Sequence, residues 1–223
     1  DTSNLCGALE FAEKISKSGT QPIIGTQIKF KYENEYGLLP LIAKNEKGYN
    51  SIVELSSKSF LDNNNHNEPY CNLDDLYKNN DGIIILTGTI EGLIGKLFLK
   101  NKYSDIRKIY TKFSQVYKNN FYIEIQRHGD INEKSFEIFN LKESKYLNSP
   151  IIATQEVYYL NSQTYEAHDA LICIGSKTYI NDKNRRRLSK DHYFKSTEEM
   201  KKIFFDLPEA LENNYNLPLR CSY

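Results

Sequence analysis

The chain alternates short, wholly apolar runs with longer stretches in which apolar residues recur every three or four positions. Ile83–Leu86 and residues 150–153 contain no polar side chain, a pattern typical of strands buried on both faces of a sheet. Residues 21–32 end instead in alternating apolar and polar positions, as in a strand with one buried face. The pattern therefore predicts strands separated by amphipathic helices.

The same criteria assign most of the chain to strands and helices. Expected strands are residues 21–32, 38–43, 83–86, 121–126 and 150–154. Expected helices are a first helix capped by residues 1–4 and ended by Gly19, then 49–60, 92–100, 104–117, 132–146, the segment after Ser162, 197–205 and 208–214. Residues 62–81 are expected to form a surface loop with one helical turn at 74–77. This alternation predicts an α/β fold with parallel strands, and leaves open whether the sheet is closed into a barrel.

Residues 150–175 are the most informative segment. Polar residues 154–156 follow the buried strand, and the carboxyl ends of strands are where α/β folds place their chemistry. Ala167, Leu171 and Ile174 then fall three or four positions apart, which predicts a helix that covers the sheet. We expect strands 83–86 and 150–154 to be central neighbours, each buried on both faces.

Composition narrows the class of protein. A chain of 223 residues can form one domain with a sizeable core. The formal net charge is +0 at pH 7, so the chain lacks an overall basic field for nucleic acid, and any DNA contact is expected to be local. No apolar run approaches the roughly 20 residues of a membrane helix, which favours a soluble, cytoplasmic protein with no membrane partner. The cysteines show no C-x-x-C pair and are interpreted as free thiols, with Cys6 and Cys173 on buried helix faces.

The sequences ATQEVYYL and AHDALICIG, both within residues 150–175, are similar to the motifs ATND-x-HY and AHD-x-L-x-CI. Further motifs follow the same order in DTSNLCGALEF, QPIIGTQIKF, LIAKNEKGYNSIVELSSKSF, GIIILTGTIEG, IEIQRHG and FKSTEEMKKIFFDLPEALENN. Together these segments resemble the PHP domain of bacterial DNA polymerase III alpha subunits over nearly the whole chain.

The resemblance implies a particular α/β fold, the distorted seven-stranded β/α barrel of PHP domains. Residues 1–223 would then be a single PHP domain, N-terminally incomplete, with the first strands of the barrel missing from the chain. A polymerase palm domain, with its catalytic carboxylates and Mg²⁺, would follow beyond the C-terminus. We therefore expect no catalytic residue in this chain itself.

The positions of the family's metal ligands hold other residues in this sequence. PHP phosphoesterases bind several metal ions through His, Asp, Glu and Cys side chains at strand ends, so that a metal-bound hydroxide can attack a phosphate. The family's ligand positions are occupied here by Thr2, Gln27, Leu38, Thr89 and Tyr158, and carboxylates remain at Asp1 and Glu156. Two carboxylates make at best a weak site for a hard cation, so the resemblance implies that this chain binds no metal.

The remaining candidates have a structural interpretation beside the functional one. The histidines are far apart in sequence and none belongs to an H-x-H or H-x-x-x-H pair, which predicts that they form no metal site. His128 follows the strand 121–126 and either contacts a partner or substrate or makes a structural hydrogen bond. Arg185, Arg186 and Arg187 either contact a phosphate or a partner or form a solvated loop. His168 and Asp169 are interpreted as a packing pair on their helix.

Three functional hypotheses follow. In the first, the domain is a scaffold within the replicative polymerase and a docking site for its proofreading exonuclease subunit, and contacts DNA only through the parent protein. In the second, it is an active metal-dependent phosphoesterase or 3'-5' exonuclease, which would need ligands at the substituted positions. In the third, it is a free-standing barrel resembling histidinol phosphatases, against which the polymerase-type ending FKSTEEMKKIFFDLPEALENN argues.

Overall fold

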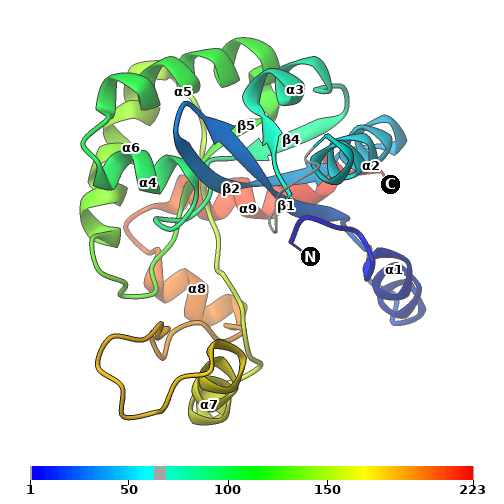
Figure 1. Ribbon diagram of the computed structural model, residues 1–223. Helices are drawn as coiled ribbons and strands as arrows, with labels where there is room; N and C mark the ends of the chain where they lie inside the picture. The colour runs from blue at the N-terminus through cyan, green and yellow to red at the C-terminus, as the bar shows by residue number, and fades with distance from the viewer. Residues whose placement is uncertain (1, 63–68, 223) are drawn as a thin grey trace.

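The structure, a computed structural model, describes residues 2–62 and 69–222 and has a mixed α/β fold (Figure 1). One sheet contains the strands β1 Gly25–Tyr32, β2 Glu35–Ala43, β3 Cys71–Asn72, β4 Ile83–Leu86, β5 Phe121–Ile125 and β6 Ile151–Ala153. Their order is β3-β1-β2-β4-β5-β6. The sheet therefore has six strands in the described part of the chain, one more than the five expected from the sequence and fewer than the seven of the PHP barrel, and its order has two ends. The expected barrel is thus not confirmed.

The direction of the strands divides the sheet into two parts. β2 runs antiparallel to both of its neighbours, β1 and β4. β4, β5 and β6 run parallel, as the alternation of strands and helices predicted. β5 lies between β4 and β6, so the expectation that β4 and β6 are neighbours was wrong. β6 is also the last strand of the sheet, so the expectation that it is central was wrong, whereas β4 has a strand on each side.

The described residues also form nine helices, some of which connect the strands of the sheet. They are α1 Ala8–Lys17, α2 Glu46–Leu61, α3 Leu73–Lys78, α4 Leu93–Leu99, α5 Tyr103–Tyr117, α6 Glu133–Leu147, α7 Tyr165–Ser176, α8 Thr197–Ile203 and α9 Pro208–Leu219, with short 3-10 turns at Lys118–Asn120 and Ser162–Thr164. Most of these segments were predicted within a few residues, including the turn within residues 62–81, which forms α3. Residues 63–68 of that predicted loop lie outside the described residues.

Alternate side chains of the parallel strands enter two different hydrophobic clusters. Ile83 and Ile85 on β4 belong to the large cluster that includes α4 and α5. Ile84 on β4 and Ile152 on β6 face the opposite way, into a smaller cluster with Leu217 of α9. These strands are thus buried on both faces, which confirms that part of the prediction from their apolar runs.

Helix α9 also covers the outer edge of β6. The side-chain amide of Asn213 donates a 2.8 Å hydrogen bond to the carbonyl of Ile151, and Asn214 donates one of 2.7 Å to the carbonyl of Ala153. A strand at the edge of a sheet otherwise leaves a row of unpaired backbone groups. α9 therefore satisfies the backbone of β6 and buries one of its faces at the same time.

The first helix differs from the prediction. α1 begins at Ala8, and its side chains are not buried, with Leu9 82% exposed. Asn4 does not cap the helix, because its side chain accepts a hydrogen bond from the Cys6 amide and donates to the Thr2 carbonyl within a local turn. Asn side chains commonly compete with helices in this way. Cys6 is exposed, contrary to expectation, whereas Cys71, Cys173 and Cys221 are buried free thiols.

Helix α7 does not cover the sheet as expected. It lies apart from the sheet, at the lower end of the molecule in Figure 1. Leu171 and Ile174, predicted to face the core, are 61% and 74% exposed, and within α7 only Cys173 is buried. One bidentate pair of hydrogen bonds, of 2.6 and 2.5 Å, joins Arg185 to Asp169 instead, so α7 packs against the segment that follows it.

In the part of the chain that the structure describes, no helix is both long and apolar enough to cross a membrane.

Candidate functional site

The positions matched to metal ligands converge on one cavity, although they come from distant parts of the chain. Gln27 on β1, Leu38 on β2, Thr89 after β4, and Glu156 and Tyr158 after β6 line a cavity of about 200 Å³. Thr2 forms an isolated parallel bridge with Gln27, and Asp1 lies outside the described residues. The motif comparison therefore identified residues that share a site.

One wall of this cavity is a turn that depends on glycine. Gly88, directly after β4, has a φ of 81°, in the left-handed region that favours glycine. This backbone places Thr89 at the cavity, which Leu38 and Pro40 of β2 also line. The turn has no phosphate-binding motif around it, as the sequence indicated.

Arg186 reaches this cavity, whereas its two neighbours do not line it. Its Nη2 lies 3.4 Å from the hydroxyl of Tyr158 and 3.5 Å from a carboxylate oxygen of Glu91. The Tyr158 hydroxyl donates a 3.1 Å hydrogen bond to Glu156, and burial, together with the charge of Glu156, raises the pKa of Tyr158. A guanidinium, a neutral phenol and a carboxylate thus form one chain of contacts across the cavity.

The other two arginines have structural contacts. The side chain of Arg185 is 1% exposed and bound to Asp169, which the sequence had interpreted as a packing partner of His168. Arg187 donates a 2.9 Å hydrogen bond to the carbonyl of Ile180. Of the residues 185–187, Arg186 is therefore the one placed for contact with a bound group.

The described lining does not fit the metal cluster that the resemblance implies for active relatives. It contains the side chains of Lys29, Lys96 and Arg186, with Glu91 and Glu156 as carboxylates, and none of its residues is His or Cys. A cluster of metal ions needs several anionic or imidazole ligands directed at common points. Three cationic groups around so small a cavity oppose the binding of a further cation.

His128 lies beside the cavity and is held by structural hydrogen bonds. It is buried, and its Nε2 accepts a 3.0 Å hydrogen bond from the amide of Glu156. Nδ1 must therefore carry the proton, and it lies 3.3 Å from a carboxylate oxygen of Glu133. This geometry matches the structural alternative that the sequence left open for His128.

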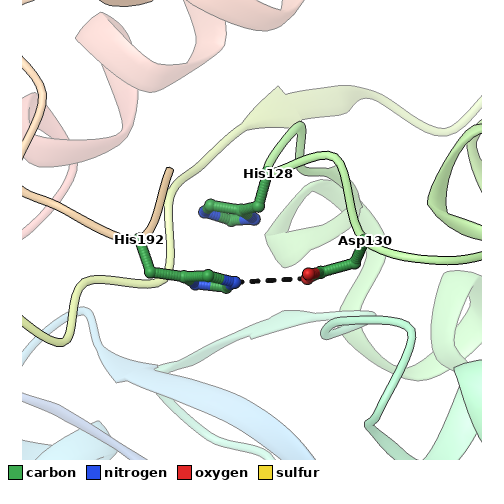
Figure 2. A group of neighbouring side chains, drawn as sticks. All are labelled: His128, Asp130 and His192. Carbon is green, nitrogen blue, oxygen red and sulfur yellow. Dashed lines mark hydrogen bonds and ion pairs between the residues drawn. The ribbon is translucent and has the colours of Figure 1, made fainter. Parts of the chain in front are cut away.

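A second histidine completes a clamp around Glu156. Figure 2 shows the ring of His192 stacked on that of His128, with centroids 4.1 Å apart and planes 4° apart. The Nδ1 of His192 donates to the carbonyl of Glu156 at 3.0 Å, and its Nε2 donates to Asp130 at 3.2 Å. The two imidazoles therefore fix the amide and the carbonyl of the same residue. Because they fix the backbone at Glu156, they also set where the Glu156 side chain enters the cavity.

The group formed by His128, Asp130 and His192 has the composition of a metal site, since its ligand atoms lie within 4.8 Å of one another. The sequence did not suggest that two histidines would meet. A metal ion bound by imidazole lies in the plane of the ring, along the nitrogen lone pair. Two rings stacked face to face have their lone pairs in separate, nearly parallel planes and cannot direct them at one ion. Both ring nitrogens of each histidine are also engaged by the protein, so the group acts as a hydrogen-bonded clamp.

A buried carboxylate supports the turn at the cavity wall. Glu124 on β5 is buried, and it accepts 2.9 Å hydrogen bonds from the amide of Gly88 and from the side chain of Gln126. The hydroxyl of Thr154 donates to the same carboxylate. Burial raises the pKa of Glu124, opposed by these donors. Sequence reasoning did not single out Glu124, although one charged residue inside the apolar run 121–125 was a signal that could have identified it.

Comparisons with known proteins identify related sequences. A family model described as "PHP domain" matches residues 1–128. The DNA polymerase III subunit alpha of Caulobacter vibrioides is 34% identical over 231 residues, covering 100% of this chain and 20% of the relative. The corresponding subunits of Rickettsia bellii and Borreliella burgdorferi are each 36% identical, over 100% and 99% of this chain.

The chain spans about a fifth of the length of these curated relatives, which cover it from end to end. The family match extends over more than half of the chain and includes Thr2, Gln27, Leu38 and Thr89, which the fold places at or beside one cavity. The chain therefore belongs to the PHP domain family.

Proposed function

We propose that the chain is the PHP domain of the alpha subunit of a bacterial DNA polymerase III. The end-to-end similarity to several proteins of that name supports this assignment. In this proposal the parent protein performs DNA-directed DNA polymerisation in chromosome replication. That activity, with its Mg²⁺ ions, belongs to a palm domain outside this chain, because the matched region is about a fifth of each relative.

The domain itself is catalytically inactive in this proposal. The observation that carries it is the contact of Arg186 with Tyr158 and, through the Tyr158 hydroxyl, with Glu156. Arg186 places a permanent positive charge at this cavity. Active PHP phosphoesterases, which the chain resembles, bind metal ions at the corresponding positions. In PHP phosphoesterases the hydroxide nucleophile is bound to metal, and the lining residues of this cavity oppose metal binding. This argues against the alternative of an active metal-dependent phosphoesterase or 3'-5' exonuclease.

The role that remains is that of a scaffold and a docking site for the proofreading exonuclease subunit. Strands buried on both faces and a clamped strand end provide a rigid body on which a partner can be held. The net charge of +0 favours a protein partner over direct DNA binding, which depends on clustered basic residues. DNA is then reached only through the rest of the polymerase.

The experiment has an activity arm and a binding arm. The purified chain and a Glu156→Gln variant are assayed on p-nitrophenyl phosphate and on a single-stranded oligonucleotide, with Mn²⁺ or Zn²⁺ added. We expect no turnover by either protein, and metal-dependent turnover that the substitution abolishes would overturn the inactive assignment. The same chain is titrated with the organism's exonuclease subunit and with single-stranded DNA over a range of salt. Tight, steeply salt-dependent DNA binding without exonuclease binding would contradict the docking role.

A further inference from the structure

The outer surface of the α5–α6 helix pair has a strong charge asymmetry in a chain of zero net charge. In these two helices, both described in full, every exposed charged residue is basic. The exposed charged residues are Arg107, Lys108, Lys112, Lys134, Lys142 and Lys145. The two helices lie side by side in Figure 1, far from the lobe formed by α7.

The acidic residues of the same helices are turned inward and engaged. Glu143 is buried and receives bonds of 3.0 and 2.8 Å from the guanidinium of Arg107. Glu137 binds Arg127, Glu133 binds the backbone at His128, and Asp105 pairs with Lys108. None of these acidic residues is exposed. Arg107 and Lys108 are paired with Glu143 and Asp105, and the positive charge of the outer surface is therefore carried mainly by the lysines at 112, 134, 142 and 145.

This surface is hollowed into a groove. A cavity of about 670 Å³ lies between the helices. It is lined on the α5 side by Ser104, Arg107, Lys108, Thr111, Lys112 and Gln115 and on the α6 side by Lys142, Glu143 and Tyr146. Tyr146 is 79% exposed. The walls therefore consist largely of lysine methylene stems and one aromatic ring, with ammonium groups at the rim.

The helices on either side of the groove are held rigidly. Tyr110 on α5 donates a 2.8 Å hydrogen bond to Asn140 on α6 in the core beneath the groove. Arg107 and Glu143 form a second connection, with Glu143 buried. A groove with fixed walls binds a partner without an entropic cost of forming the site.

We propose that this α5–α6 groove is a docking site for an acidic amphipathic helix of a partner protein. Lys108 and Lys112 are four residues apart on one helix, the spacing at which Asp or Glu side chains recur along one side of a facing helix. One or two apolar residues of that helix would cover Tyr146 and the lysine stems. The phosphates of a nucleic acid could pair with the lysine ammonium groups, but they would leave the apolar walls of the groove without apolar contacts. The groove shares no lining residue with the cavity at Glu156, so the inference does not depend on the proposed loss of metal chemistry.

The probe is a labelled peptide of about 18 residues, long enough to form a helix, with leucines on one side and glutamates on both flanks. Its binding to the chain is measured by fluorescence anisotropy. A scrambled peptide of equal composition and an oligothymidylate of equal charge serve as competitors. We expect the amphipathic peptide to bind about tenfold more tightly than the scrambled one, because only the former matches the apolar walls.

The paired substitutions Lys112→Glu and Lys142→Glu should weaken peptide binding by about tenfold or more. The pair Lys183→Glu and Lys202→Glu makes the same charge change at exposed positions elsewhere and should leave it within about twofold. Equal binding of the scrambled peptide, or equal loss in both variants, would overturn the proposal. Tighter binding of the oligothymidylate would assign the groove to nucleic acid and overturn it as well. None of these measurements involves metal or the exonuclease subunit, so they do not test the proposed function.

Discussion

The imidazole rings of His128 and His192 are stacked 4.1 Å apart and bind opposite ends of the Glu156 backbone. The two rings differ in which of their nitrogens donate and which accept hydrogen bonds. His128 accepts a bond from the Glu156 amide and is therefore the neutral imidazole. His192 faces an acceptor at both nitrogens, which favours its protonated form.

This arrangement predicts a pH-dependent contribution to stability. Burial lowers the pKa of His192, but its hydrogen bonds to Asp130 and Glu156 outweigh burial, so its pKa lies above the ordinary 6.5. The hydrogen bond from His192 lowers the pKa of Asp130 below 3.8. The raised pKa of His192 means that its contribution is fully present below pH 6.5 and is lost as the pH rises through the folded value. The contribution of Asp130 is lost only as the pH falls through its own lowered value.

Urea unfolding of the chain and of an Asp130→Asn variant tests this prediction. The variant should be less stable at about pH 6, and the difference in unfolding free energy should shrink as the pH rises through the raised pKa of His192. Glu212→Gln, at an exposed position on α9, is the matched control and should show no such trend. A difference between Asp130→Asn and the original chain that stays constant with pH would contradict the assignment of charge to His192.

Glu124 provides a second prediction, because its carboxylate has three donors and little access to water. Glu124→Gln replaces one acceptor oxygen by an NH₂ group that faces a donor. Leaving a buried donor unsatisfied costs about 1–3 kcal/mol of unfolding free energy. The measurement is denaturant unfolding at neutral pH, with Glu54→Gln at an exposed position on α2 as the control. If both variants were equally stable, Glu124 would not hold the Gly88 turn in place.

The parallel strands could be predicted from the sequence because strands buried on both faces appear as short runs of apolar residues. The runs at Ile83–Leu86 and residues 150–153 are apolar throughout, and the structure buries both faces of each strand. Local pattern did not determine which strands are neighbours, since β5 lies between β4 and β6. It also did not determine what covers a helix: the apolar positions Leu171 and Ile174 of α7 face outward.

The site was predictable only in part for the same reason. Gln27, Leu38, Thr89 and Tyr158 were found by matching motifs, and they do share a cavity. The pairing of His128 with His192 has no signal in a single sequence, because the two residues are far apart along the chain. The sequence also could not distinguish Arg186 from its neighbours, because Arg185 and Arg187 are the same residue type but form hydrogen bonds with other partners.

The metal content of the chain remains a prediction. Protein purified without an affinity tag and dialysed should contain zinc and manganese well below one ion per chain by mass spectrometry. The expected reason is the set of cations, Lys29, Lys96 and Arg186, around the cavity at Glu156. Stoichiometric metal that is lost in Glu156→Gln would place an ion in that cavity and contradict the prediction. Stoichiometric metal that survives in this variant but is lost in Asp130→Asn would place it at the histidine clamp.

The last prediction concerns the strand that carries Glu156 and Tyr158. Ile152 on β6 is 2% exposed and packs with Ile84 and with Leu217 of α9. Ile152→Ala removes buried methyl groups between the sheet and that helix, and should lower the unfolding free energy by about 2–5 kcal/mol. Ile131→Ala, at a position 86% exposed, should change it by less than about 0.5 kcal/mol. β6 lies at one end of the sheet order, so a loss well under about 1 kcal/mol for Ile152→Ala would mean that α9 does not bury this strand. The end of β6, and with it the cavity, would then lack the rigid support that the proposed scaffold role requires.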